Sequence, residues 1–241
     1  MKMRPICMIA HRGYSSKYLM NTEQAFVEAA RHGSGGAETD IRRTKDGVYV
    51  CSHDDNAVLA DGTRLFVAES TFAELTAQPL RNDKTANDVY LCTFRRYLEI
   101  MRDNRMVCFV ELKGPFTDEQ VGEVFGMVAE VYELKQCILQ SFDFDNLLRA
   151  RARFPELPLM LTYGSNESHY ERCFDYGFSL DIDYNVVTEE IIREFHDRGL
   201  EVAVWTVNTP EAFARFKNMD VDYIESDVYG GFDLSTEEAV P

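Results

Sequence analysis

Two short motifs of the 241-residue chain, Glu38-Thr39-Asp40 and Glu111-Leu112-Lys113, each place two charged side chains two residues apart in a candidate strand or at its end. Residues two apart in a strand point to the same face, so each pair would project together. Carboxylates gathered in a buried site repel one another, and a hard divalent cation with oxygen ligands removes that repulsion. The sequence therefore predicts Glu38, Asp40 and Glu111 as ligands of a divalent cation. A solvent-facing polar stripe is the alternative for the first pair.

Two histidines and two cations complete this chemical set. His11 is followed by Arg12, and His53 is followed by Asp54, which could orient an imidazole. Histidine titrates near neutral pH and therefore suits general acid–base catalysis. Arg12 offers a planar fork and Lys113 a point charge for phosphate oxygens. A structural histidine and a salt bridge at a strand end are the alternatives for these groups.

Strands must position these residues, and short apolar runs alternate with helix-period segments along the chain. Candidate strands are Ile6–Ala10, Ala37–Arg42, Val48–Ser52, Met106–Leu112, Cys137–Ser141, Leu159–Tyr163, Phe178–Asp183, Glu201–Val207 and Asp222–Ser226. Helical patterns cover Thr22–His32, Phe94–Asp103, Asp118–Glu133, Phe144–Arg153, Thr188–Arg198 and Pro210–Lys217. Alternation of this kind predicts a parallel sheet. The length and about eight repeats favour a closed α/β barrel, a (β/α)8 TIM barrel, over an open doubly wound sheet.

Nine candidate strands are one too many for such a barrel. The excess lies at Ala37–Arg42 and Val48–Ser52, which Asp46-Gly47 separates. Asp-Gly between two strands is a strong hairpin signal, although two successive barrel strands without a helix are also compatible. If Asp46-Gly47 forms a two-residue turn, Asp40 faces His53 across the hairpin.

The region 55–90 is polar and too long for a plain barrel loop, and its one helix-like piece is Ser70–Ala77. We interpret it as a small insertion over the C-terminal mouth of a single barrel domain, 1–241. The insertion would be a lid over the substrate, with an irregular crossover of no functional role as the alternative.

Composition restricts the partners. The chain has 25 Lys and Arg against 41 Asp and Glu, a net charge of −16. A surface this acidic repels nucleic acid and anionic membranes. We therefore expect a small-molecule partner, no nucleic acid and no stable membrane association. The six cysteines form no CxxC pair, and no run of 18 apolar residues occurs. We therefore expect reduced thiols and a cytoplasmic location, while the oligomeric state stays open.

Trp205, the one tryptophan, lies near the end of a late candidate strand. It could form a wall of the barrel mouth and hold an alkyl or choline-like group by apolar or cation–π contact. Core packing is the alternative.

Several motifs follow one another in a specific order between residues 6 and 230. They are His11-Arg12-Gly13, Asn21-Thr22, Glu38-x-Asp40, Thr44-Lys-Asp-Gly47, His53-Asp54, Glu111-Leu-Lys113, Gln140-Ser-Phe142, Trp205-Thr-Val-Asn208 and Asp222-Tyr-Ile-x-Ser-Asp227. As an ordered set, these motifs resemble those of the glycerophosphodiester phosphodiesterases.

The resemblance implies a TIM barrel with its site at the C-terminal ends of the strands. It implies hydrolysis, dependent on Mg²⁺ or Ca²⁺, of glycerophosphodiesters such as glycerophosphocholine or glycerophosphoethanolamine to sn-glycerol 3-phosphate and an alcohol. The implied roles are an acid–base pair, His11 and His53; metal ligands, Glu38, Asp40 and Glu111; and phosphate contacts, Arg12 and Lys113. Attack by water and attack by a neighbouring substrate hydroxyl, through a cyclic phosphate, are both compatible with these residues.

One departure concerns substrate preference. The family usually has Pro-Glu before Asn-Thr, and this chain has Leu19-Met20 there. Two alternatives are a lysophospholipase D or phosphoinositide-type phosphodiesterase and a non-catalytic ligand-binding barrel. An acyl chain would need an apolar route, for which the candidates are Phe66, Phe72, Tyr90 and Phe94.

Overall fold

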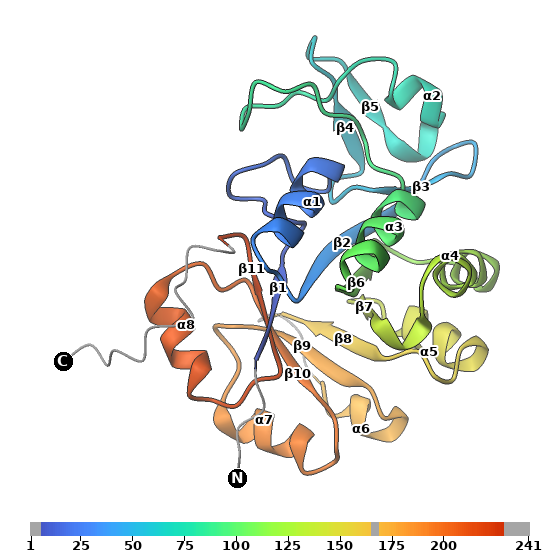
Figure 1. Ribbon diagram of the computed structural model, residues 1–241. Helices are drawn as coiled ribbons and strands as arrows, with labels where there is room; N and C mark the ends of the chain where they lie inside the picture. The colour runs from blue at the N-terminus through green and yellow to red at the C-terminus, as the bar shows by residue number, and fades with distance from the viewer. Residues whose placement is uncertain (1–5, 165–168, 229–241) are drawn as a thin grey trace.

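Eight parallel strands close into a barrel in the computed structural model, which describes residues 6–164 and 169–228 (Figure 1). The barrel strands are β1 (Cys7–Ala10), β2 (Gly36–Arg43), β6 (Val107–Leu112), β7 (Cys137–Ser141), β8 (Leu159–Tyr163), β9 (Ser179–Asp183), β10 (Val202–Trp205) and β11 (Tyr223–Ser226). Strand β1 pairs with both β2 and β11, which closes the barrel. The predicted TIM barrel is confirmed; β7 and β8 have the predicted bounds, and the ends of the other barrel strands lie within two residues of those predicted.

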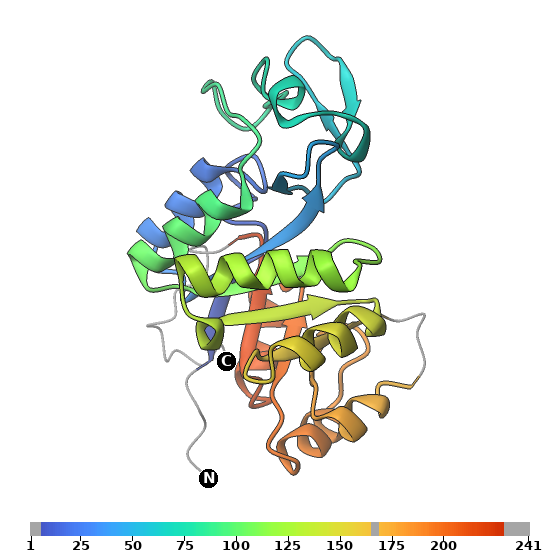
Figure 2. The same cartoon turned by 90° about the vertical axis from the view of Figure 1, so that its right-hand side faces the viewer.

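Helices cover the outside of the barrel (Figures 1 and 2). They are α1 (Glu23–Arg31), α3 (Phe94–Asn104), α4 (Asp118–Val131), α5 (Phe144–Arg153), α6 (Arg172–Tyr176), α7 (Glu189–His196) and α8 (Pro210–Lys217), with a short 3-10 turn η2 (Leu134–Gln136) before β7. A threonine hydroxyl accepts a backbone N–H at the start of α1, α3, α4, α7 and α8, which satisfies an amide that the helix leaves unpaired. Within the described residues, no helix is long and apolar enough to cross a membrane.

The interior of the barrel changes from apolar to polar along the strands. An apolar cluster inside it consists of Ile9, Phe109, Ile138, Met160 and Ala203. Two residues further along the same chain segments are His11, Glu111, Gln140, Thr162 and Trp205. Because strand side chains repeat every two residues, these groups follow the cluster on the same face. A polar layer therefore lies closer to the C-terminal ends of the strands than this apolar cluster, which we call the apolar plug.

The extra predicted strand is a hairpin partner outside the barrel. Strand β3 (Tyr49–Cys51) pairs antiparallel with the end of β2, and Ile41 faces Cys51. The predicted hairpin is confirmed, but the predicted register is wrong. The turn has three residues, 45–47, and the backbone N–H of Ser52 donates to the carbonyl of Asp40 at 2.8 Å, so Asp40 faces Ser52 rather than His53.

The side chain of Thr44 explains this longer turn. Its hydroxyl donates to Oδ1 of Asp46 at 2.6 Å and accepts the backbone N–H of Val48 at 2.9 Å. Gly47 closes the turn with φ of +87°, a conformation that glycine adopts without a side-chain clash.

Residues 55–90 form a small unit beyond β3 (Figures 1 and 2). It consists of a hairpin of β4 (Asn56–Val58) and β5 (Arg64–Phe66), a 3-10 turn η1 (Val67–Glu69) and the short helix α2 (Phe72–Leu75). Ala57, Val67 and Leu75 pack with Val50 and Leu91 in a cluster of their own. The helix α2 has only four residues, so the helix predicted over Ser70–Ala77 is shorter than expected.

Candidate active site

The C-terminal ends of neighbouring strands bring the predicted site residues together. His11 and Arg12 follow β1, Glu38 and Asp40 lie within β2, Glu111 and Lys113 are at the end of β6, and His53 is two residues beyond β3. The parallel register of β2 and β6 places Asp40 opposite Glu111. Residues from four separate segments therefore reach one end of the barrel.

Three carboxylates form the centre of this group. One oxygen each of Glu38, Asp40 and Glu111 lie within 4.8 Å of one another. Glu38 and Asp40 are 2% and 0% exposed. Oε2 of Glu38 accepts the backbone N–H of Arg12 at 2.9 Å, and its buried Oε1 has no hydrogen-bond partner among the described residues.

Two cations stabilise Asp40. Nζ of Lys113 lies 3.0 Å from Oδ1 of Asp40 and 2.7 Å from Oε1 of Glu111. Nε of Arg12 lies 3.3 Å from Oδ2 of Asp40. Burial raises the pKa of Asp40, but Lys113, Arg12 and a hydrogen bond from Asn21 outweigh it and hold that pKa below its usual value.

The other two carboxylates have raised pKa values. Burial raises the pKa of Glu38 well above its usual range, and the charge of Asp40 adds to the effect. Burial also raises the pKa of Glu111, although Lys113 opposes the shift. Three acids compete here for two cations, so the site favours additional positive charge.

His11 is oriented by an acid that directly follows the last strand. Its Nδ1 lies 2.7 Å from Oδ1 of Asp227, which also accepts a hydrogen bond from the hydroxyl of Ser15 at 2.9 Å. Oδ2 of Asp227 accepts a hydrogen bond from Asn208 at 2.6 Å. Burial raises the pKa of Asp227, but these hydrogen bonds and the charge of His11 lower it to about 2. The contact fixes the imidazole by one nitrogen.

Gly13 makes the turn after His11 possible. It has φ of +78°, and a Cβ there would lie 2.7 Å from the backbone carbon of Ala25 in α1. Only glycine allows this close approach, so the turn after β1 is held against α1.

His53 is more exposed than His11. Its Nδ1 lies 2.9 Å from Oδ1 of Asp54, which confirms the expected orienting contact. Arg42 donates two hydrogen bonds to the carbonyl of His53, at 2.7 and 3.1 Å, and so fixes the backbone. Partial burial lowers the pKa of His53; Asp54 opposes the shift, and the nearby charges of Arg12 and Lys113 reinforce it.

Asn21 has a structural role at the site that its sequence motif alone did not assign. Its Nδ2 donates to Oδ2 of Asp40 at 2.7 Å, and its Oδ1 accepts from the hydroxyl of Thr39 at 2.8 Å. The residue before it, Met20, places its sulfur 3.5 Å from Nη1 of Arg12. Met20, where the sequence departs from the family pattern, therefore contacts Arg12, which is predicted to bind the phosphate.

Two further buried acids, Asp181 and Glu225, were not singled out from the sequence. Nε2 of Gln140 donates to Oε1 of Glu225 at 2.6 Å. Burial raises the pKa values of Asp181 and Glu225 well above their usual ranges. The only available sequence signal is their alternation with apolar residues in the strands.

Trp205 stands at the rim rather than in the core. It is partly exposed, its Nε1 donates to the carbonyl of Asp181 at 3.3 Å, and its ring meets Phe142 edge-on with 5.9 Å between centroids. Phe142 is itself 42% exposed.

Two cavities border the site, and the 55–90 unit contributes to both. One of about 520 Å³ includes His11, Arg12 and Asp227, with Asp83 and Lys84 from the unit. The other, of about 200 Å³, includes His53, and its wall is largely apolar: Leu19, Met20, Ala57, Val58, Leu80 and Leu91.

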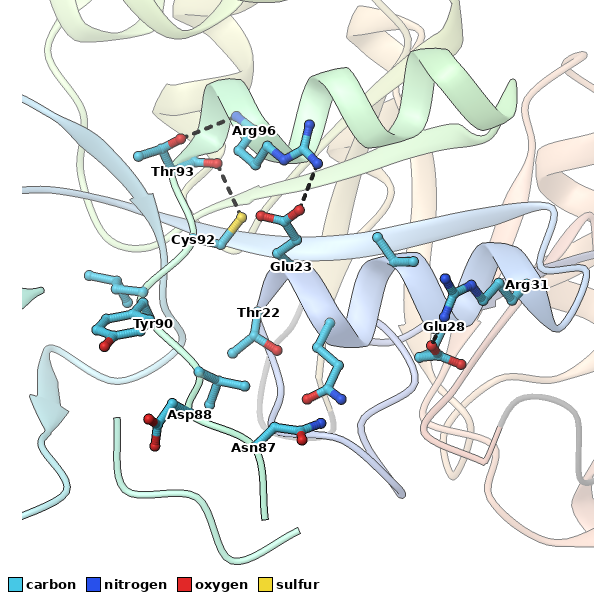
Figure 3. Close-up of a pocket in the computed structure, with 14 residues that line it drawn as sticks. Thr22, Glu23, Glu28, Arg31, Asn87, Asp88, Tyr90, Cys92, Thr93 and Arg96 are labelled. Atoms are coloured by element: carbon cyan, nitrogen blue, oxygen red, sulfur yellow. Dashed lines mark hydrogen bonds and ion pairs between the residues drawn. The ribbon is translucent and has the colours of Figure 1, made fainter. Parts of the chain in front are cut away.

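A third cavity, of about 590 Å³, lies between α1, residues 87–93 and Arg96 of α3 (Figure 3). Glu23 and Arg96 form an ion pair in it, and none of the predicted site residues lines it.

Comparisons with known proteins agree on one family. The model of the glycerophosphoryl diester phosphodiesterase family matches residues 11–230. A glycerophosphodiester phosphodiesterase of Caldanaerobacter subterraneus is 27% identical, over 91% of this chain and 93% of its own.

Solved structures agree as well. The structure of a Thermotoga maritima glycerophosphodiester phosphodiesterase superposes with a TM-score of 0.76 at 27% identity, covering 94% of this chain and 96% of the other. An Oleispira antarctica phosphodiesterase in complex with the product sn-glycerol 3-phosphate shares the fold, with a TM-score of 0.82 at 21% identity, over 93% and 94% of the two chains.

Proposed function

The chain belongs to the glycerophosphoryl diester phosphodiesterase family of enzymes, and we propose that it hydrolyses small glycerophosphodiesters, such as glycerophosphocholine or glycerophosphoethanolamine, to sn-glycerol 3-phosphate and an alcohol. The position of two oriented histidines near a group of three carboxylates, two of them buried, carries this proposal. The Oleispira antarctica phosphodiesterase of the same fold, whose structure is a complex with the product sn-glycerol 3-phosphate, supports the choice of product.

The carboxylates Glu38, Asp40 and Glu111 suit a divalent cation. Their oxygens lie within 4.8 Å of one another, and the buried Oε1 of Glu38 has no other partner among the described residues. Oxygen-only donors fit a hard cation, so we propose Mg²⁺ or Ca²⁺. When bound, such an ion supplies positive charge against the phosphoryl oxygen and the glycerol hydroxyls.

Arg12 and Lys113 are proposed to bind the phosphate. Both lie at the carboxylate group and both carry hydrogens that suit phosphate oxygens. Each now forms ion pairs with Asp40, so contact with a substrate would require them to share or exchange these partners. Positive charge at the site also offsets the net charge of −16, which repels an anionic substrate at longer range.

The two histidines are proposed to transfer protons. Asp227 holds Nδ1 of His11, and Asp54 holds Nδ1 of His53, so Nε2 of each ring is the nitrogen available to the substrate. One imidazole takes the proton of the attacking hydroxyl, from water or from the substrate itself. The other donates a proton to the leaving alkoxide. Two such groups predict a bell-shaped pH dependence of kcat/KM.

The 55–90 unit is proposed to act as a lid that selects the alcohol. It lines both cavities beside the histidines. The apolar cavity at His53 has only about 200 Å³, which suits a small alcohol better than an acyl chain. Of the aromatic residues considered for an acyl route, Phe94 is fully buried and stacks on Tyr97. Trp205 at the rim is proposed to contact an alkyl or choline group of the substrate.

The test is release of sn-glycerol 3-phosphate from glycerophosphocholine and glycerophosphoethanolamine with Mg²⁺, Ca²⁺, Mn²⁺ or EDTA. We expect metal-dependent release that falls by about 100-fold or more in His11→Ala and Glu38→Ala. His32→Ala and Glu119→Ala, at exposed positions, are the matched controls and should retain the rate.

Two results would count against the proposal. Release that survives both His11→Ala and Glu38→Ala would remove the assigned roles. Turnover of micellar lysophosphatidylcholine, with none of the soluble diesters, would favour a lysophospholipase D instead.

A further inference from the structure

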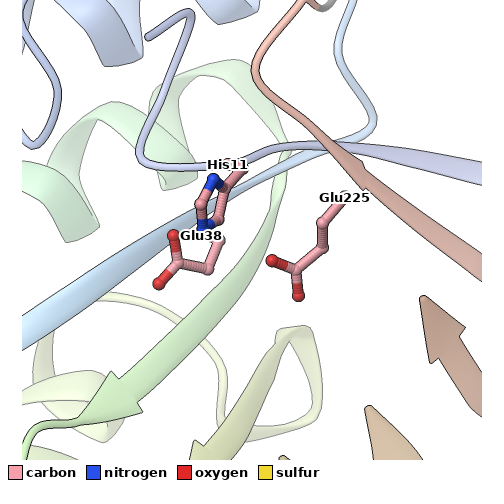
Figure 4. A group of neighbouring side chains, drawn as sticks. All are labelled: His11, Glu38 and Glu225. Carbon is pink, nitrogen blue, oxygen red and sulfur yellow. The ribbon is translucent and has the colours of Figure 1, made fainter. Parts of the chain in front are cut away.

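A second group of possible metal ligands adjoins the first and shares one residue with it. It consists of His11, Glu38 and Glu225, and one ligand atom of each lie within 4.8 Å of one another. Figure 4 shows the three side chains close together; His11 follows β1, Glu38 lies in β2 and Glu225 in β11, and β1 pairs with both of the other strands. His11 is 15% exposed at its side chain, and both acids are 2% exposed.

Each of the three side chains is held by one atom. Asp227 holds Nδ1 of His11 at 2.7 Å. The backbone N–H of Arg12 holds Oε2 of Glu38 at 2.9 Å, and Gln140 holds Oε1 of Glu225 at 2.6 Å. The atoms that remain for a ligand are one imidazole nitrogen and one oxygen of each acid.

Two features point to a cation rather than to a plain acidic cluster. First, Oε1 of Glu38 is buried and has no hydrogen-bond partner among the described residues. Second, a histidine that donates its other ring nitrogen to a carboxylate is the usual arrangement of a metal ligand, because the carboxylate fixes the tautomer and the ring. Asp227 is fixed in turn by Ser15 and Asn208.

The donor set differs from that of the first group. Glu38, Asp40 and Glu111 offer oxygen only, which suits Mg²⁺ or Ca²⁺. The second group replaces one oxygen by an imidazole nitrogen, which suits borderline ions such as Zn²⁺. The two groups therefore distinguish two classes of cation, with Glu38 able to bridge them.

We propose that His11, Glu38 and Glu225 form a second, inhibitory cation subsite with a preference for Zn²⁺. A bound Zn²⁺ takes the lone pair of Nε2 of His11, so this nitrogen can no longer accept or deliver a proton. Inhibition rests on the role of His11 in the proposed function, whereas binding of the ion does not.

The test measures Zn²⁺ binding by calorimetry with Mg²⁺ held at saturation, in wild type, Glu225→Gln and Asp181→Asn. Glutamine keeps the size of Glu225 and can still accept the hydrogen bond from Gln140. Asp181→Asn is the matched control, because it removes another buried acid of the barrel interior that belongs to neither group. We expect Glu225→Gln to weaken Zn²⁺ binding by about tenfold or more, the order of effect that loss of a group at a metal site produces. Asp181→Asn should leave binding unchanged.

Inhibition provides the second readout. Each protein is compared with its own rate without Zn²⁺. Wild type and Asp181→Asn should be inhibited at the Zn²⁺ concentration at which they bind the ion. Glu225→Gln should need a higher concentration, by the factor that its Zn²⁺ affinity is lowered. Equal affinity in wild type and Glu225→Gln, or equal weakening in both variants, would overturn the subsite. Binding that depends on Glu225 in a protein without hydrolase activity would keep the subsite and reject the proposed function.

X-ray absorption at the zinc edge decides the question independently of the variants, including the case in which Glu225→Gln does not fold. The subsite predicts one imidazole nitrogen among otherwise oxygen ligands in the wild type. A shell of oxygen alone would place Zn²⁺ in the first group and refute the proposal.

Discussion

The side chain of Asp40 is held by a hydrogen bond from Asn21 as well as by its own strand, β2. The amide of Asn21 joins Asp40 to Thr39, while its backbone stands at φ of +57°, in the left-handed region. Asparagine tolerates this conformation better than most residues do. One side chain therefore fixes both the turn after β1 and the orientation of a proposed metal ligand.

We predict that Asn21→Ala lowers the free energy of unfolding by about 2–4 kcal/mol, since it leaves buried partners unpaired and adds left-handed strain. Asn21→Gly loses the same hydrogen bonds without the strain, so it should be about 1 kcal/mol more stable than Asn21→Ala. Urea unfolding measures both. Equal stability of the two variants would show that the backbone conformation costs nothing here.

The contact between Asp227 and His11 leads to a pH prediction. The pKa of Asp227 falls from 3.8 to about 2, so the stabilisation it gives is complete above about pH 4 and is lost as pH falls through about 2. The asparagine side chain cannot ionise, so the destabilisation caused by Asp227→Asn should be largest above pH 4 and shrink toward about pH 2. Thermal unfolding at several pH values measures the difference, and a difference independent of pH would contradict the assignment.

Asp227→Asn should also reduce activity, because the amide no longer fixes His11 in one tautomer. We expect kcat/KM to fall by about 100-fold, within the usual contribution of a positioned acid or base. Ser15→Ala is the control: it removes one hydrogen bond to Asp227 and leaves the contact with His11, so its effect should be small. The pH profile of kcat/KM separates a lost proton-transfer step from general damage.

Residue chemistry alone could select seven candidate site residues but not the residues that hold them in place. His11, Arg12, Glu38, Asp40, His53, Glu111 and Lys113 are charged or titratable groups at strand ends, and the barrel does bring them together. Asp181 and Glu225 look like ordinary strand residues until the barrel closes and their side chains meet those of other strands. The link from Gln140 to Glu225 spans 85 residues, and no local pattern specifies such a pairing.

At the scale of elements, the barrel strands were predictable and the hairpin register was not. Each strand carries a short apolar run between helical patterns, which is a signal spread over many residues. The register of β2 and β3 depends on one turn, where Thr44 stabilises a three-residue loop instead of a two-residue one. A shift by one residue moved His53 out of the position opposite Asp40.

Two glycines in hairpin turns offer a matched comparison. Gly47 has φ of +87° between β2 and β3, and Gly62 has φ of +90° between β4 and β5. Alanine at either should cost about 1 kcal/mol of stability because of the left-handed conformation. A Cβ at Gly47 would also lie 3.0 Å from Arg43, whereas none of the described atoms lies within 4 Å at Gly62.

Only Gly47→Ala should lower kcat/KM, because the turn that it distorts sets the position of His53. Activity and urea unfolding of the two variants, measured side by side, test this expectation. An equal loss of activity in Gly62→Ala would mean that the register of the first hairpin is not the cause.

At the scale of the whole molecule, the proposed metal site would couple folding to cation binding. Glu38, Asp40 and Glu111 are brought together only in the folded barrel. An ion that binds there, and not to the unfolded chain, stabilises the fold by about 2.7 kcal/mol at 100 times its Kd. We therefore predict that Mg²⁺ or Ca²⁺ raises Tm above its value in EDTA.

Glu111→Gln should abolish most of this rise in Tm, and Glu119→Gln, on the exposed side of α4, should retain it. Differential scanning calorimetry across a metal titration gives both values. A rise that is the same in the two variants would place the stabilising ion elsewhere on the molecule.

The apolar plug below the polar layer closes one end of the barrel, so the polar interior opens only at the other end. Ile9, Phe109, Ile138, Met160 and Ala203 fill the end away from the active site. Protons that the interior acids gain or lose must therefore pass through the mouth that the substrate also enters. If the substrate binds at this mouth as proposed, it would slow proton exchange between the interior acids and the solvent until the product leaves.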